Sequence, residues 1–120
     1  MRVDHSQLVE IFLWEGDVEA AWREAKEGGC HDSLWLRFAA EREEEHPEDA
    51  ISVYTEQLEP TLRFPDKDAY REAVGLLRKI RQLMSRLGKE NEFASLVRSV
   101  RAQHKPKRNL MKLLDAEGWQ

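Results

Sequence analysis

The sequence contains one cysteine, no long apolar run and no secretion signal, and each absence excludes a class of protein. A lone cysteine, Cys30, cannot close an internal disulfide, which fits a reducing cytoplasm. No apolar run approaches the ~20 residues that a membrane-spanning helix requires. The N-terminal residues lead into an amphipathic helix instead of the apolar core of a signal peptide. We therefore expect a cytoplasmic protein without a membrane partner.

Signatures of catalysis and nucleotide binding are also missing. The sequence has no glycine-rich phosphate loop, no Gly-x-Ser-x-Gly turn and no dinucleotide fingerprint. Cys30 and His31 are adjacent, but a zinc site needs two more ligands at suitable spacing, and a nucleophile pair needs an orienting third group. The carboxylates between Glu41 and Asp49 are typical of a solvated helix face. We predict no enzyme, no catalytic residues, no metal and no cofactor.

Helical periodicity is the strongest signal that is present. In residues 70–87 apolar side chains recur every three or four positions, and Gly88 follows where a helix C-cap favours glycine. No segment alternates apolar and polar residues as a strand does, and no hairpin dipeptide occurs. The pattern predicts seven helices. The first runs from about Asp4 or Ser6 to Trp14, the second covers about 18–27, and the third is capped by Asp32 or Ser33. The others run from Pro47 to a kink or end at Pro60, over about 67–87 and 90–104, and from Pro106 to a stop at Gly118.

The same pattern predicts which side chains are buried. In the first helix we expect Leu8, Ile11 and Phe12 to face inward, with Val9 as a further candidate. We expect core positions for three of the four tryptophans and exposure for Trp119, near the end of the chain. The three core tryptophans are Trp14, Trp22 and Trp35. The run of charged residues 41–45 is expected to lie in solvent.

Short connections between consecutive helices imply antiparallel neighbours. Helix pairs stacked in sequence order give a right-handed array and not a closed bundle. The predicted fold is therefore all-α, a right-handed array of antiparallel helix pairs that forms a single domain over residues 1–120.

Two stretches, residues 16–22 and 46–54, each begin with acidic residues and then place an alanine before an aromatic. They resemble the second helix of tetratricopeptide repeats, although their spacing is not 34 residues and most of the first-helix signature is missing. A resemblance over most of the chain is to the C-terminal helical region of bacterial SWIM zinc-finger proteins. It is carried by residues 13–17, 46–50, 70–73 and 103–114. That family has an upstream site of three cysteines and a histidine, which has no counterpart here. The resemblance implies a fragment of a longer bacterial protein.

Charge is divided unevenly along the sequence. Residues 1–65 carry 16 acidic and 6 basic side chains, a balance of −10, and residues 66–120 carry 7 acidic and 13 basic, a balance of +6. Such a division indicates an anionic partner for the basic half, or attraction between the two halves. The residues predicted to form a basic patch are Arg71, Arg78, Arg81, Arg98, Arg101, Lys105, Lys107 and Arg108.

Two functional hypotheses follow. The first is a non-enzymatic interaction module that holds a protein segment, or an upstream domain of the same chain, on a concave helical surface. The alternative is a nucleic-acid-associated domain that binds phosphates through the basic half. Few aromatic residues lie among the basic ones, so the sequence gives no support for stacking of single-strand bases.

Overall fold

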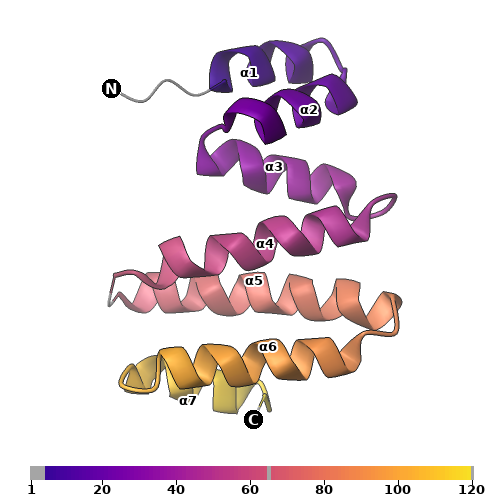
Figure 1. Ribbon diagram of the computed structural model, residues 1–120. Coiled ribbons are helices and arrows are strands. Elements are labelled where there is room, and N and C mark those ends of the chain that lie inside the picture. Colours follow the sequence, from indigo (N-terminus) through magenta and orange to yellow (C-terminus); the bar gives the residue numbers. More distant parts are fainter. Residues whose placement is uncertain (1–4, 65, 120) are drawn as a thin grey trace. The chain divides into compact units, whose positions relative to one another are not determined.

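The structure is a computed structural model that describes residues 5–64 and 66–119. Within these residues the chain forms seven α-helices and no strand, which confirms the predicted all-α class (Figure 1). None of the described helices combines the length and apolar character needed to span a bilayer. The chain divides into two compact units, Met1–Val53 and Tyr54–Gln120, and the boundary falls inside helix α4 (Pro47–Leu62). The prediction of a single domain stays a prediction.

The first unit contains α1 (Ser6–Trp14), α2 (Val18–Gly28), α3 (Asp32–Arg42) and the start of α4. Helix α2 packs against both α1 and α3. The Asp17 carboxylate accepts a hydrogen bond from the Ala20 amide at 3.1 Å and caps α2. Gly29, with φ of 79°, ends α2, because few other residues adopt that conformation.

A cluster of aromatic rings packs in the first unit. The rings of Trp22, Trp35 and Phe38 meet edge to face or tilted, with centroids 5.6–6.2 Å apart. The predicted inward face of α1 is only partly correct. Val9 and Leu13 are buried and Phe12 is half-buried. The exposed large apolar residues on this helix are Leu8, Ile11 and, with 88% exposure, Trp14. Most residues of α1 are apolar, so the periodicity did not identify which side packs on α2.

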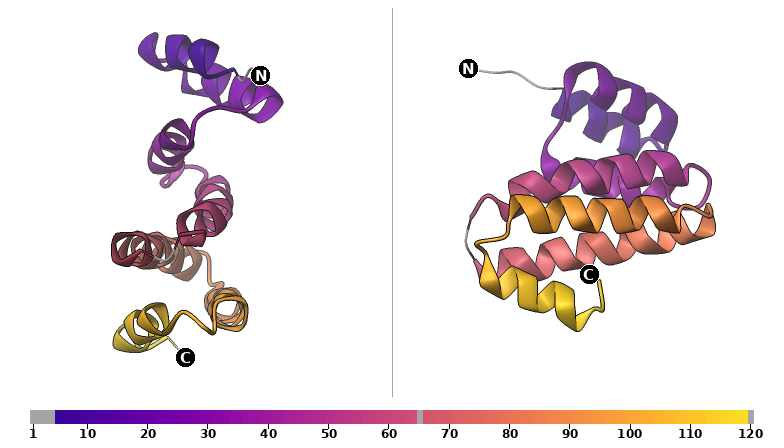
Figure 2. Two further views of the ribbon diagram at one scale, coloured as in Figure 1. Left: turned by 90° about the vertical axis from the view of Figure 1, so that its left-hand side faces the viewer. Right: turned by 60° about the horizontal axis from the view of Figure 1, so that its bottom comes forward.

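The second unit contains the rest of α4, α5 (Lys67–Arg86), α6 (Glu90–Gln103) and α7 (Arg108–Ala116). Helix α5 contacts both α6 and α7 (Figure 2). Its apolar stripe is buried as predicted, and Leu77 and Ile80 are inaccessible to solvent. Gly88, with φ of 70°, follows the helix where the sequence predicts its end.

One alternative for Pro60 and the expectation for Trp119 are wrong. Helix α4 does not end at Pro60 but continues to Leu62, since a proline this close to the end removes only one hydrogen bond of the last turn. A kink at Pro60 stays a prediction. Trp119 is 8% exposed, and its ring packs edge to face on Phe93 with centroids 5.2 Å apart. Burial of this large apolar ring draws the C-terminal residues against α6.

Candidate binding surfaces

The eight residues of the predicted basic patch lie on three helices of the second unit and on the turn between two of them. Arg71, Arg78 and Arg81 are on α5, Arg98 and Arg101 are on α6, Lys105 and Lys107 precede α7, and Arg108 is its first residue. Six are exposed, and Arg101 and Lys107 are partly buried.

Arg78 and Arg101 hold the C-terminal segment. The Arg78 guanidinium donates hydrogen bonds to the Glu117 carboxylate, whose bond and charge raise the pKa of Arg78. Arg101 donates to the Asp115 carboxylate at 2.7 Å and to the Trp119 carbonyl. Both arginines therefore have intramolecular partners, and these partners belong to the basic half of the chain rather than the acidic half.

The other arginines of the patch are less constrained. Arg98 donates to the Ser95 hydroxyl at 3.1 Å, and Arg71 lies 3.9 Å from the Asp68 carboxylate in an exposed pair. An exposed pair at this distance contributes little stability and leaves the charge available to other anions. Arg71 and Arg81 line different hollows, so the structure does not gather all eight residues into one site.

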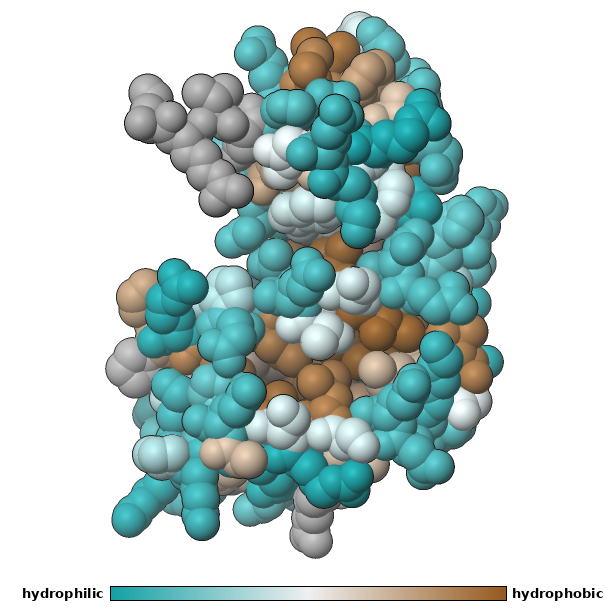
Figure 3. Space-filling view, viewed as in Figure 1, coloured by the Kyte–Doolittle hydropathy of each residue, from teal (hydrophilic) through white to brown (hydrophobic). Residues whose placement is uncertain are grey.

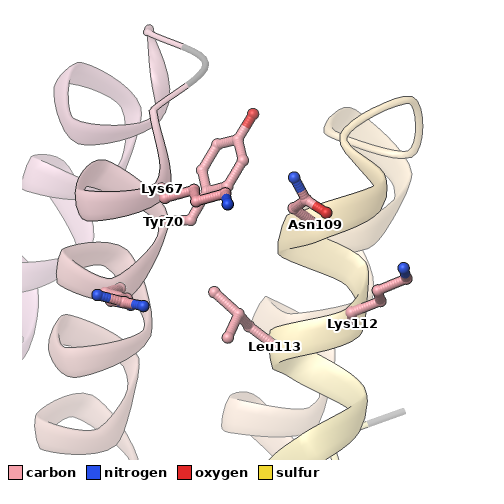
Figure 4. A pocket seen from close by; sticks show the side chains of 6 residues that line it. Lys67, Tyr70, Asn109, Lys112 and Leu113 are labelled. Carbon is pink, nitrogen blue, oxygen red and sulfur yellow. The ribbon is translucent and has the colours of Figure 1, made fainter.

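Arg71 belongs to a pocket between α5 and α7 with a volume of about 270 Å³. Figure 4 shows Lys67 and Tyr70 on α5 facing Asn109 and Leu113 on α7. The pocket-lining residues are Lys67, Tyr70, Arg71, Asn109, Lys112 and Leu113. Three of the six are cationic and none is acidic.

An exposed apolar ridge is the most prominent feature of the first unit. Leu8, Ile11 and Trp14 are 47%, 45% and 88% exposed, and they follow one side of α1 at helical spacing. Val9 and Leu13 on the opposite side are buried. Figure 3 shows hydrophobic atoms at the surface over α1, at the top of the view. We call Leu8, Ile11 and Trp14 the α1 ridge.

A buried arginine is the most constrained charge of the first unit. Arg42 is only 5% exposed, so the expectation that the whole run 41–45 lies in solvent is wrong. Its guanidinium donates to Glu19 at 2.8 Å and to Asp49 at 2.9 and 3.2 Å, and its Cζ lies 4.5 Å from the centroid of the Trp22 ring. Two carboxylates and an aromatic face compensate for the lost hydration of the cation.

The hollow next to Arg42 has a volume of about 400 Å³ and a mostly acidic lining. His46 also lines it, with Nε2 3.9 Å from the Glu19 carboxylate. Among the described residues no group of three or more His, Cys, Asp and Glu side chains is arranged to hold a metal ion. Each of the three guanidinium nitrogens of Arg42 donates to a carboxylate, so the charge of this residue is already paired within the protein.

Arg42 could have been found from the sequence. It lies four residues after Phe38 and three after Ala39, so it continues the buried stripe of α3. The α1 ridge has no comparable signal, because α1 carries apolar residues on most of its sides. The α5–α7 pocket depends on which side of α7 packs against α5, which the sequence leaves undetermined.

No protein-family model, curated protein or solved structure matches this chain. The resemblance to SWIM zinc-finger proteins therefore stays a prediction, and functional inference depends on the surfaces themselves.

Proposed function

We propose that this chain is a non-enzymatic protein-interaction module whose α1 ridge docks a helix of a partner protein. One observation carries the proposal, the exposure of Leu8, Ile11 and Trp14 along one side of α1. Exposed apolar groups that lie together mark interaction sites more often than scattered ones do. Tryptophan is enriched among the residues that dominate binding energy at interfaces.

The spacing of the ridge suits a helical partner. Ile11 lies opposite the buried side of α1, with Leu8 on one side of it and Trp14 on the other. Two helices that pack together interdigitate side chains at such three- and four-residue spacings. An amphipathic helix of the partner would bury the ridge with its own apolar stripe.

The charges beside the ridge favour a basic partner helix. Glu10 on α1 and Glu15, which follows the helix, are both exposed, and α1 has no basic residue between Ser6 and Trp14. A lysine- or arginine-flanked helix would complement these carboxylates, which mainly accelerates association and fixes orientation. Such a helix can come from another protein or from a further domain of a longer chain, as the SWIM resemblance implies.

The proposal includes the finer architecture predicted from the sequence, a right-handed array of antiparallel helix pairs similar to tetratricopeptide repeats. In that arrangement each helix pair packs on the next, and an apolar side of an outer helix is a natural place for a further helix to pack.

The test uses two designed peptides with the same apolar stripe, one flanked by lysines and one by glutamates. Trp14 is the most exposed tryptophan, so docking should shift its fluorescence to shorter wavelength. We expect micromolar binding of the basic peptide and at least tenfold weaker binding of the acidic one. Ile11→Ser should weaken the basic peptide at least tenfold, because a central apolar contact is lost. Phe64→Ser, which removes an exposed aromatic outside α1, is the matched control and should leave binding unchanged.

Equal loss in Ile11→Ser and Phe64→Ser, or no binding of either peptide, would refute docking on the ridge. The nucleic-acid alternative is measured with a DNA duplex at about 50 and 200 mM salt, since each phosphate contact steepens the salt dependence by roughly one unit. Duplex binding that falls steeply with salt, and is lost on charge reversal of Arg98 and Arg108, would favour that alternative.

A further inference from the structure

The pocket between α5 and α7 has the chemistry of an anion site. Lys67 and Arg71 come from the first turns of α5, and Lys112 comes from α7. All three side chains are exposed, so their charges are accessible to a ligand. The protein does not have to bury and dehydrate them to form the pocket. We propose that this pocket binds a small phosphate-bearing molecule.

The surroundings strengthen the positive potential of the pocket. Lys107 Nζ lies 6.0 Å from the centroid of the Tyr70 ring, which lines the pocket, so a fourth cation is nearby. The neighbouring acid, Asp68, is 89% exposed and 3.9 Å from Arg71, so it neutralises that guanidinium only weakly. Arginine suits phosphate because its planar group can donate two parallel hydrogen bonds to the oxygens.

The remaining walls favour an organic phosphate over a bare ion. Leu113 and the buried Tyr70 provide apolar surface, and the Asn109 amide can both donate and accept hydrogen bonds. Figure 4 shows Leu113 directed toward α5, whereas Lys112 points away from it, which places the Lys112 ammonium at the rim. A phosphate near Lys67 and Arg71 would leave the rest of the molecule against Leu113 and Asn109.

The size of the pocket sets the class of ligand. Its volume of about 270 Å³ lies just below the range of roughly 300–1,000 Å³ that is typical of sites for drug-sized ligands. A small diphosphate or phosphate ester fits this space. The pocket is separate from the α1 ridge, since all six lining residues belong to the second unit.

The test is isothermal titration of the full chain with inorganic pyrophosphate at about 50 mM salt, where screening is moderate. The double variant Lys67→Gln/Lys112→Gln removes two pocket cations. The control double variant Arg81→Gln/Arg98→Gln removes the same charge from exposed positions on α5 and α6 outside the pocket. Circular dichroism checks that both variants are folded. Two further ligands are titrated for comparison. Malonate carries two carboxylates at a spacing similar to that of the two phosphates of pyrophosphate, and a 12-nucleotide single strand carries phosphates on a polymer.

We expect saturable one-to-one binding of pyrophosphate, at least tenfold weaker in Lys67→Gln/Lys112→Gln and within twofold of the parent in the control. Malonate should bind at least tenfold more weakly than pyrophosphate. Absence of saturable binding, or equal losses in the two double variants, would overturn the site, since only the general charge of the unit would then attract the anion. Equal affinity for malonate would overturn the assignment to phosphate. An oligonucleotide that binds more tightly and displaces pyrophosphate would overturn the assignment to a small molecule.

Discussion

The two units carry opposite net charges, and each holds charges of its rarer sign in ion pairs. Residues 1–53 carry 14 acidic and 5 basic side chains, a balance of −9, and residues 54–120 carry 9 acidic and 14 basic, a balance of +5. In the acidic unit Arg42 is buried between Glu19 and Asp49. In the basic unit the carboxylates of Asp115 and Glu117 are held by arginines.

In both units, therefore, these charges of the rarer sign serve structure. A rare cation among many carboxylates is held strongly, and so is a rare carboxylate among many cations. The charges of the common sign outnumber their partners and are available to ligands. By this reasoning Glu10 and Glu15 are available beside the α1 ridge, and Lys67 and Lys112 at the α5–α7 pocket.

The largest effects are expected from cavities in the two cores. Phe38 and Leu77 are both inaccessible to solvent, one in each unit. Phe38→Ala should cost about 3–5 kcal/mol and Leu77→Ala about 2–5 kcal/mol of unfolding free energy, because each leaves a cavity as well as losing apolar burial. Urea titration followed by circular dichroism measures both values.

The same variants test whether the units unfold together. Three of the four tryptophans lie in the first unit. In a Trp119→Phe background tryptophan fluorescence therefore reports that unit alone. If the units are independent, Leu77→Ala should leave the fluorescence transition unchanged while part of the circular dichroism transition moves to lower urea. Coincident shifts in both signals would show one cooperative domain, as the sequence predicts.

The second prediction concerns the buried arginine. Arg42→Met should destabilise the first unit by about 2–3 kcal/mol, since removing one partner of a buried ion pair typically costs 3–5 kcal/mol. The lower figure is expected because Glu19 and Asp49 keep 60% and 40% side-chain exposure and can be rehydrated. Arg37→Met, at an exposed position of the same helix, should change stability by less than about 0.5 kcal/mol.

Thermal unfolding of Arg42→Met, Arg37→Met and the parent chain measures these changes in stability. Arg101→Met in the second unit should have an intermediate effect of about 1 kcal/mol, because that side chain is 22% exposed. If Arg42→Met were as stable as Arg37→Met, burial of the rarer charge would not stabilise the unit. The distinction between charges that stabilise the fold and charges that are available to ligands would then be wrong.

The sequence predicted the helices better than their packing. Helix α5 and its caps follow from local information, namely an apolar repeat, an aspartate before the first turn and a glycine after the last. The start of α4 at Pro47 is equally local, because proline favours the first turn of a helix.

Packing depends on partners that are distant in sequence. Arg42 meets Glu19 across 23 residues, and Arg78 meets Glu117 across 39, so neither pair is visible as a local pattern. The sequence predicts burial of the α1 ridge, because burial of any apolar side of a helix is favourable. The packing of α2 decides which side of α1 is buried. The prediction of a basic patch rests on charge alone. In the structure some of its residues hold the C-terminal segment, one lines the α5–α7 pocket, and others lie on the open surface.

The smallest effects, and opposite signs, are expected from two helical glycines, one in each unit. Gly75 lies inside α5 with open space where a Cβ would be, so Gly75→Ala should stabilise the second unit by about 0.5–1 kcal/mol. Gly28 is the last residue of α2, and a Cβ there would overlap the His5 ring. Gly28→Ala must therefore displace His5, whose Nδ1 lies 2.6 Å from the Glu24 carboxylate and whose amide donates to the Gly29 carbonyl at 3.0 Å.

The loss of these contacts should outweigh the gain in helix propensity and destabilise the first unit by about 1 kcal/mol. A double-mutant cycle with His5→Ala isolates the cause, since Gly28→Ala should become neutral or stabilising once the ring is absent. Urea midpoints of the three variants and the parent provide the cycle. If Gly28→Ala destabilised equally with and without His5, the cost would lie in the backbone of α2 and not in the packing of His5 at its end.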